Sequence, residues 1–374
     1  MRDAMTSTNR SLAIDVLRGL TVALMIVVNN SVDDSIVYSQ LAHAKWLGLT
    51  LTDLVFPTFL FVVGISLSLS FEKYQKLGNA AVLRKILVRT ALIFLCGYLK
   101  DWFPFFQLDS AGHIALLPME HTRIFGVLQR IALCYGAAAL LLHYAGRRAT
   151  FVFGMVALLG YWALLYLFGD YSLTGNAAIK LDLLLVGAPH MYHGEGIAFD
   201  PEGILSTLPA IVNVLAGYFA GSLLRERGRN FETLTRLLLL GGLCIVTALL
   251  WDNVLPISKK LWTSSYALCT IGIDLYLVAL LVYLIDIRGT GRWTYFFEVF
   301  GRNTLFIYVL SEVGETLLGM FQVGNQDLVM WLYEHAFRSW LGAKNGALLY
   351  AMAYMLCCWG VAYAMDRRRI YIKL

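Results

Sequence analysis

Long apolar runs are the feature that most constrains how this chain can fold. They follow one another along its 374 residues, and an α-helix needs about 20 mostly apolar residues to cross a bilayer. The runs lie at 12–30, 53–71, 84–99, 125–143, 150–168, 205–224, 235–251, 263–285, 295–311 and 345–365. No soluble core needs so many. We therefore predict an all-α, polytopic transmembrane helical bundle of about ten spans.

Composition supports a membrane protein of one domain. Hydrophobic residues make up 59% of the chain and charged residues 15%, whereas soluble domains have roughly 45–50% and about 25%. Residues 1–374 show no repeat or soluble segment, so we predict a single transmembrane domain. All six cysteines fall in apolar runs without zinc-type spacing, so no metal site is expected. The first apolar run is too long for a cleavable signal peptide, and none is expected.

The basic residues indicate an orientation. Most of the 30 lysines and arginines lie in the tails and in the loops on the N-terminal side of the predicted membrane, as at 147–148, 225–229, 288–292 and 367–369. By the positive-inside rule this predicts cytoplasmic termini and an even number of spans. We expect contact with membrane lipid and none with nucleic acid. The aromatic, amphipathic stretch 327–341 is predicted to lie at the interface.

Ionisable groups inside the first predicted span need an explanation, because a charge in hydrocarbon costs at least about 2.5–3.5 kcal/mol. Asp15, Arg18 and Asn29 lie there, and the last two are about 20° apart on a helical wheel. One interpretation is a self-neutralising Asp15–Arg18 pair, with Asn29 as an interfacial cap. The other is a polar track that lines a cavity.

A second set of polar residues lies at the start of the fourth predicted span. Arg123 and Arg130 are seven residues apart and share a helix face with Gln129 between them. Arginine forks bind phosphate oxygens well. Alternatively, Arg130 neutralises an acid on another span, for which the candidates are Asp15, Asp274 and Glu298. Late in the chain, polar groups also follow one helix, at Asn303, Tyr308, Ser311 and Glu312.

The stretch from His43 to Pro57 combines a helix start with a loop histidine. Thr50 and Asp53 have the spacing of a capping box, which is a sufficient structural account of both. His43 lies just before that helix, on the same predicted side as Asn29. A loop histidine is more often a solvated residue than a catalytic one, and spacing alone leaves both interpretations open.

Motifs in chain order resemble the catalytic membrane domain of the heparan-α-glucosaminide N-acetyltransferase family, including its bacterial members. The two longest are Asp15-Val16-Leu17-Arg18-Gly19 with Val28-Asn29, and the stretch from His43 to Pro57. Shorter matches lie at 123–130, 199–206, 261–266, 301–304 and 367–374. The resemblance covers essentially the whole chain. The family's lysosomal enzyme has an additional N-terminal lumenal domain and one more span, which leaves the acceptor open.

The resemblance implies an acetyl-coenzyme A-dependent N-acetyltransferase. Family members bind the donor from the cytoplasmic side and acetylate a terminal glucosamine amine on the lumenal side. The family's active-site histidine falls on His43, as general base or transient acyl carrier, and its asparagine falls on Asn29, as an oxyanion donor. The coenzyme is then expected to contact Arg18, Arg123, Gln129, Arg130 and Asn303. The acceptor is expected to contact Asp53, Asp200, Glu202, Lys260, Trp262 and Ser264.

Two points stay open at the level of sequence. Asp200-Pro201-Glu202-Gly203 is equally well explained as the turn and cap of the sixth predicted span. A secondary transporter or channel would also place Asp and Arg inside a membrane, although the chain lacks the internal repeats typical of transporters. With the resemblance, we expect a transmembrane acetyltransferase of a bacterial inner membrane. Its acceptor would be an amino sugar or glycan. The oligomeric state stays open, with a homodimer as one possibility because dimers are common in the family.

Overall fold

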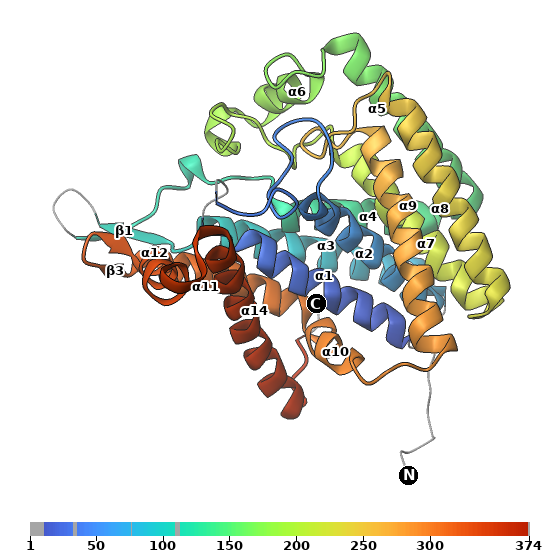
Figure 1. Cartoon of the computed structure of the whole chain (residues 1–374). Coiled ribbons are helices and arrows are strands. Elements are labelled where there is room, and N and C mark those ends of the chain that lie inside the picture. The colour runs from blue at the N-terminus through green and yellow to red at the C-terminus, as the bar shows by residue number, and fades with distance from the viewer. Residues whose placement is uncertain (1–10, 33–35, 76, 109–112, 373–374) are drawn as a thin grey trace.

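The computed structural model describes residues 11–32, 36–75, 77–108 and 113–372, and most of them are helical (Figure 1). The first half contains α1 (Leu12–Asn29), α2 (Leu51–Gln75), α3 (Asn79–Trp102), β1 (Phe106–Leu108), β2 (Ile114–Leu116), η1 (Met119–His121), α4 (Val127–Tyr144), α5 (Gly146–Phe168), α6 (Ala177–Leu185) and η2 (Ala188–His190). The second half contains α7 (Thr207–Arg227), α8 (Phe231–Asp252), α9 (Ser264–Leu281), η3 (Val282–Ile287), α10 (Thr294–Arg302), α11 (Thr304–Met320), β3 (Gln322–Val323), β4 (Gln326–Asp327), α12 (Leu328–Leu332), η4 (Tyr333–Arg338), α13 (Ser339–Leu341) and α14 (Ala343–Arg367).

The predicted all-α membrane bundle is confirmed. Among the described residues, eight helices are long and apolar enough to cross a membrane: α1, α2, α4, α5, α7, α8, α9 with η3, and α14. The strands in the described ranges form two short antiparallel pairs. The stretch 327–341, predicted at the interface, forms β4 residue Asp327 followed by α12, η4 and α13. The Asp327 carboxylate caps α12 by accepting from the Met330 N–H at 2.8 Å.

The predicted span at 84–99 lies within α3, which does not have the composition of a span. This helix is 24 residues long, but charges lie near both of its ends, at Arg84, Lys85, Arg89, Lys100 and Asp101. Its length alone would cross a bilayer, and its central residues are apolar. The charges exclude it from the candidate spans.

The predicted span at 295–311 is wrong as a single helix. The chain forms α10 and α11 with a break at Asn303, where φ is −127° and ψ is 37°. The Asn303 side-chain amide donates to the Ile370 carbonyl and accepts from the Ile372 N–H, both at 2.9 Å. An asparagine that bonds to backbone groups competes with helix formation. The C-terminal tail therefore holds the break, which apolar periodicity does not record.

Glycines let α1 approach α10 closely. A Cβ on Gly19 would lie 1.8 Å from the carbonyl oxygen of Phe297, and one on Gly301 would lie 2.4 Å from the carbonyl oxygen of Asp15. Small residues at a helix contact permit this packing inside a membrane. The contact places the break between α10 and α11 beside the first two turns of α1, where Arg18 lies.

Helix ends gather at two opposite ends of the bundle. At one, Arg229 after α7 lies 3.4 Å from Asp286 of η3, which also accepts from Ser11 before α1 at 3.1 Å. Arg225 of α7 donates there to the carbonyl of Ser68, late in α2, at 2.6 Å. We call this the basic end, because the arginine-rich segments 147–148, at the start of α5, and 225–229, at the end of α7, lie at it.

The opposite end is built from the loops that precede α2 and α9. The Trp46 indole donates to the Tyr171 carbonyl, and Ser258 donates to the Trp46 carbonyl, both at 2.7 Å. Gly48 donates to Ile257 at 2.7 Å. These contacts hold residues 43–50 against residues 257–263, and we call this the His43 end. Because α2 runs from it to Ser68, it lies across the bundle from the basic end.

Candidate active site

His43 forms a hydrogen-bonded pair with a buried carboxylate. Its Nδ1 lies 2.7 Å from Oδ1 of Asp53, and the Asp53 side chain is 0% exposed whereas that of His43 is 41% exposed. An ionised carboxylate only accepts hydrogen bonds, so the network assigns the proton to Nδ1. The neutral ring then keeps a lone pair on Nε2. A carboxylate orients a histidine general base in this way.

Asp53 is itself fixed by the start of α2. Its Oδ2 accepts from the backbone N–H of Ala44 at 3.1 Å and of Thr50 at 3.0 Å. The Thr50 hydroxyl lies 2.9 Å from the same oxygen. The cap suggested by the Thr50–Asp53 spacing is therefore present, and one carboxylate serves both purposes: Oδ2 holds the helix start and Oδ1 holds His43.

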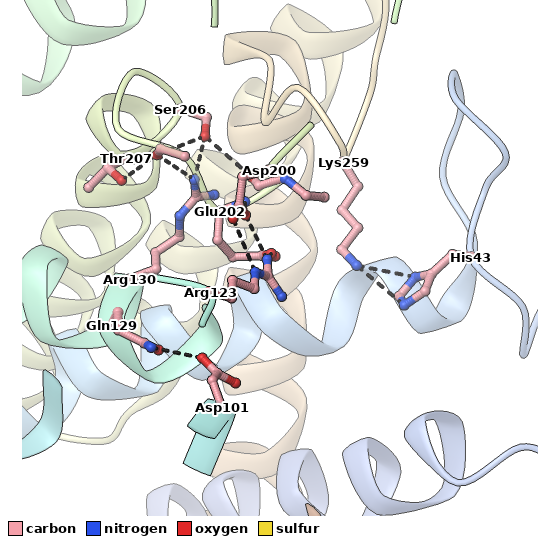
Figure 2. Close-up of polar contacts among 12 residues, drawn as sticks. His43, Asp101, Arg123, Gln129, Arg130, Asp200, Glu202, Ser206, Thr207 and Lys259 are labelled. Atoms are coloured by element: carbon pink, nitrogen blue, oxygen red, sulfur yellow. Dashed lines mark hydrogen bonds and ion pairs between the residues drawn. The ribbon is translucent and has the colours of Figure 1, made fainter. Parts of the chain in front are cut away.

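Lys259, which the sequence motifs do not assign to the site, lies against the His43 ring (Figure 2). Its Nζ is 3.3 Å from Nδ1 and 3.3 Å from Nε2. Burial lowers the pKa of Lys259, and the charges of Glu202 and Asp53 offset only part of this effect. The half-buried amino group of Lys259 thus stands beside the nitrogen that can act as a base. Chain position could not single it out, because Lys260 adjoins it.

The residues at 260–264 that were assigned to the acceptor are bonded inside the protein. Lys260 donates to Glu195 at 2.7 Å. The buried Trp262 indole donates to Asn213 at 3.2 Å, and the buried Ser264 hydroxyl donates to the α5 backbone at 2.7 Å. Trp262 and Ser264 thus anchor the loop that carries Lys259.

Arg123 forms ion pairs with two acids, Asp200 and Glu202, as Figure 2 shows. Its Nε and Nη2 donate to Asp200 at 3.0 and 2.6 Å, and Nη2 also donates to Glu202 at 2.5 Å. Burial alone would raise the pKa of Glu202, but Arg123, Arg130 and Lys259 lower it. The Arg123 fork therefore holds carboxylates rather than standing open to a phosphate. The Asp200 carboxylate also accepts from the Glu202 N–H at 3.0 Å, as expected of a turn.

Arg130 is fully buried beside this turn. Its Nη2 donates to the Gly203 carbonyl at 3.0 Å and to the Ser206 hydroxyl, and its guanidinium lies 5.0 Å from the centre of a Trp262 ring. Nε and Nη1 have no hydrogen-bond partner among the residues described. The three acids considered as its partners, Asp15, Asp274 and Glu298, contact Arg18, Thr58 and Arg302 respectively.

Asn29 belongs to a second polar cluster. Its Nδ2 donates to Glu312 at 3.0 Å, and Lys100 donates to the other oxygen of Glu312 at 3.3 Å. Lys100 also lies 2.9 Å from Asp101, and the buried Gln129 donates to Asp101 at 2.8 Å. The cluster joins the end of α1 to α3, α4 and α11.

Electrostatics connects the Asn29 cluster to the His43 pair. Burial would lower the pKa of Arg123, but Glu202, Asp200 and also Asp101 raise it. Glu202 in turn interacts with Lys259, which touches His43. No direct contact between Asn29 and His43 is recorded among the described residues, so these two predicted catalytic residues are related only through intervening charges.

Arg18 faces a cavity that reaches toward the basic end. Its Nη2 donates to Ser66 at 2.6 Å and its Nη1 to the Gly301 carbonyl at 3.3 Å. Arg18 also lies 3.7 Å from Asp15, so both sequence interpretations of the first span hold in part. The cavity has a volume of about 470 Å³, and its cationic lining residues are Arg18, Arg89 and Arg302. Asn303 is bonded to the tail instead, although Ile372 of that tail lines the cavity.

Metal ligands do not gather in the described part of the chain: no group of three or more His, Cys, Asp or Glu side chains there is arranged to hold an ion. At the His43 end, the side chains of His43, Asp53 and Lys259 can perform acid–base chemistry.

The fold and this site define a polytopic α-helical membrane protein with a carboxylate-oriented histidine at one end and an arginine-lined cavity toward the other. The family model described as "Heparan-alpha-glucosaminide N-acetyltransferase, catalytic" matches residues 10–249. The chain belongs to this family. It is 30% identical to human heparan-alpha-glucosaminide N-acetyltransferase over 361 residues, 81% of this chain and 53% of the relative.

The mouse protein of the same name is 29% identical over 369 residues, 83% of this chain and 54% of that relative. The chain therefore spans about half the length of the curated relatives that it matches. The resemblance that the motifs suggested is confirmed.

Proposed function

We propose that this protein is a membrane-embedded acetyltransferase of a bacterial inner membrane. It moves an acetyl group from cytoplasmic acetyl-coenzyme A to an amino sugar of glucosamine type on the extracytoplasmic side. The observation that carries the proposal is the Asp53–His43 pair, with Lys259 against the ring, across the bundle from the arginine-lined cavity. Family membership supports the acetyl chemistry, and the name of the relatives supplies the acceptor class.

The cavity fits the charge of the donor. Acetyl-coenzyme A carries phosphates at one end and its thioester at the other. Arg18, Arg89 and Arg302 line the cavity, and the Nε of Arg89 is buried with no partner among the described residues. Arginine forks are well suited to phosphate oxygens. In this proposal, these three residues hold the nucleotide end, and the apolar lining residues of α2 and α4 guide the arm toward the His43 end.

His43 is the proton carrier in the proposed reaction. Acetyl-coenzyme A supplies the acetyl group as a thioester. Nε2 of His43 removes a proton from the acceptor amine as its nitrogen bonds to the acetyl carbon, and Asp53 stabilises the resulting imidazolium. His43 then returns that proton to the departing sulfur, so both residues end as they began. Such acid–base catalysis contributes about 10²–10⁴-fold.

Two donors are assigned to the acetyl oxygen in the proposal. The ammonium of Lys259 stands beside the ring and donates to the acetyl oxygen as negative charge develops on it. Asn29 uses one Nδ2 hydrogen on Glu312, and a side-chain amide has a second hydrogen to donate. Removal of one such donor typically costs about 10²–10³-fold in rate.

The test is acetyl transfer by the purified full chain in detergent, with labelled acetyl-coenzyme A and a panel of amino sugars. Wild type should acetylate glucosamine and leave glucose unlabelled. His43→Ala should lose at least about 100-fold while donor binding is retained. His193→Ala is the matched control, because the one hydrogen bond of the His193 ring to a described residue is with the nearby Met191 carbonyl. Wild-type transfer by His43→Ala would remove His43 from the mechanism.

Sidedness has its own test. Single cysteines at positions 43 and 369, in a chain whose native cysteines are replaced, should react with a membrane-impermeant maleimide only from outside for 43 and only from inside for 369. Labelling of both from the same side would overturn the proposed orientation without affecting the chemistry.

A further inference from the structure

A groove at the basic end lies apart from both the His43 pair and the arginine-lined cavity. It runs between the first turns of α5 and the last turns of α7, and its volume of about 570 Å³ is within the roughly 300–1,000 Å³ of small-molecule sites. None of its lining residues lines the cavity that holds Arg18. Its lining includes Arg147, Arg148, Phe151, Val152, Ser222 and Glu226.

The groove carries an excess of positive charge. Arg147 lies 2.8 Å from Glu226, the one acid in the lining. Arg148 is exposed and has no hydrogen-bond or ion-pair partner among the residues that the structure describes. Arg225 also lies 3.5 Å from Glu226. An anion entering the groove would therefore meet an unmatched guanidinium at Arg148.

A buried hydroxyl in the same lining also lacks a partner. Ser222 is 1% exposed, and its Oγ makes no hydrogen bond within the described part of the chain. A helical serine commonly bonds to the carbonyl one turn back, as Ser66 does in α2, but Ser222 does not. A ligand oxygen in the groove would satisfy this group, because buried polar atoms are almost always hydrogen-bonded.

An exposed apolar stripe leads away from the groove along α5. Phe151 and Val152 are 58% and 59% exposed, and Met155, Val156 and Leu159 continue the same face. Only 28% of the apolar window of α5 is buried. A molecule with its anionic group at Arg148 could thus lay a hydrocarbon chain along this stripe, whereas a soluble anion would gain nothing from it.

We propose that this groove binds one phospholipid with an anionic headgroup. Its phosphate contacts Arg148 and the Ser222 hydroxyl, and its acyl chain lies along Phe151, Val152 and the stripe that follows them. The charge excess selects an anionic head over a zwitterionic one, and the continuity of the groove with the stripe selects a lipid over a free phosphate. The site is independent of acetyl transfer.

The test is native mass spectrometry of the full chain in a neutral detergent, titrated with phosphatidylglycerol or with phosphatidylcholine of the same acyl chains. Wild type should bind one phosphatidylglycerol with a clear preference over phosphatidylcholine. Arg148→Gln should weaken that binding about fivefold, the effect of one cation near an anionic lipid. Ser222→Ala should weaken it less, with no loss of thermal stability in lipid-free detergent.

The matched control is Arg292→Gln, an exposed arginine that lines none of these cavities, and it should bind as wild type does. Equal affinity of wild type for the two lipids, or an unchanged preference in Arg148→Gln, overturns the proposal. So does equal binding of glycerophosphoglycerol, which has the headgroup without acyl chains and would make the groove a soluble-anion site. A lipid-independent dimer that Arg148→Gln abolishes would assign the groove to a second copy of the chain instead.

Discussion

Replacing Asp53 with asparagine tests whether Asp53 sets the tautomer of His43, because the substitution leaves the surrounding structure in place. The new side chain has the same size, but the two oxygen positions of Asp53 have different neighbours. Oδ2 accepts from the N–H groups of Ala44 and Thr50, so an NH₂ there would face two donors. The amide oxygen must therefore take the Oδ2 position, and the amide nitrogen takes the Oδ1 position, 2.7 Å from His43 Nδ1.

The consequence falls on the tautomer of His43. With an amide N–H donating to it, Nδ1 has to accept, and the ring proton moves to Nε2, the nitrogen that has to act as base. We expect kcat to fall by about 10²–10⁴. The helix cap at Thr50 keeps its acceptor, so the free energy of unfolding should fall by only about 1–2 kcal/mol, and acetyl-coenzyme A affinity should not change.

The assay is single-turnover acetyl transfer together with donor binding by calorimetry and a thermal melt. Asp170→Asn is the control, because Asp170 is an exposed acid bonded to its own turn at Ser172. A kcat for Asp53→Asn within about threefold of wild type, with the melt unchanged, would refute the view that Asp53 sets the state of His43.

Three further outcomes follow from the contacts. Lys259→Met should cost about 10²–10³-fold in kcat with donor affinity kept, while Lys45→Met, a change to an exposed lysine of the loop before α2, should change neither. Asn303→Ala removes both bonds to the tail, so donor affinity measured by calorimetry should fall more than kcat. Burial raises the pKa of Asp182 to about 6, above its unfolded value near 3.9, so stability is lost as pH rises from about 4 to 6. Asp182→Asn should therefore increase the free energy of unfolding at pH 7.5 by up to about 3 kcal/mol and change it little at pH 4. A thermal melt at the two pH values measures this as a higher melting temperature at pH 7.5 only.

The parts of the fold that the sequence predicts are those set by local composition. The run at 12–30 predicts α1 (Leu12–Asn29) almost to the residue, because the membrane demands an apolar helix of that length. The break at Asn303 escapes prediction, because its partners Ile370 and Ile372 lie more than 60 residues away. The charges that set α3 apart are visible in the sequence, but the apolar centre of this helix is long enough to predict a span.

The same division holds for the site. His43 and Asp53 are ten residues apart, and both can be chosen from one motif. The cap at Thr50 alone would explain Asp53, and only the structure shows that its other oxygen, Oδ1, holds His43. Lys259 meets His43 across 216 residues, and Asn29 meets Glu312 across 283. Pairings of that range are made by helix packing, and no local spacing records them.

The charges between His43 and Asn29 bear on which form of the acceptor can react. Each of these acids already has a cationic partner: Glu202 and Asp200 share Arg123, and Glu312 pairs with Lys100. An incoming ammonium group would therefore find no unpaired carboxylate to bind and would be repelled by Lys259. If the protein transfers acetyl groups as proposed, this arrangement favours the neutral amine, the only form with a lone pair to attack a thioester. In Lys259→Met the repulsion is gone, so a protonated amino sugar should inhibit that variant more strongly than wild type.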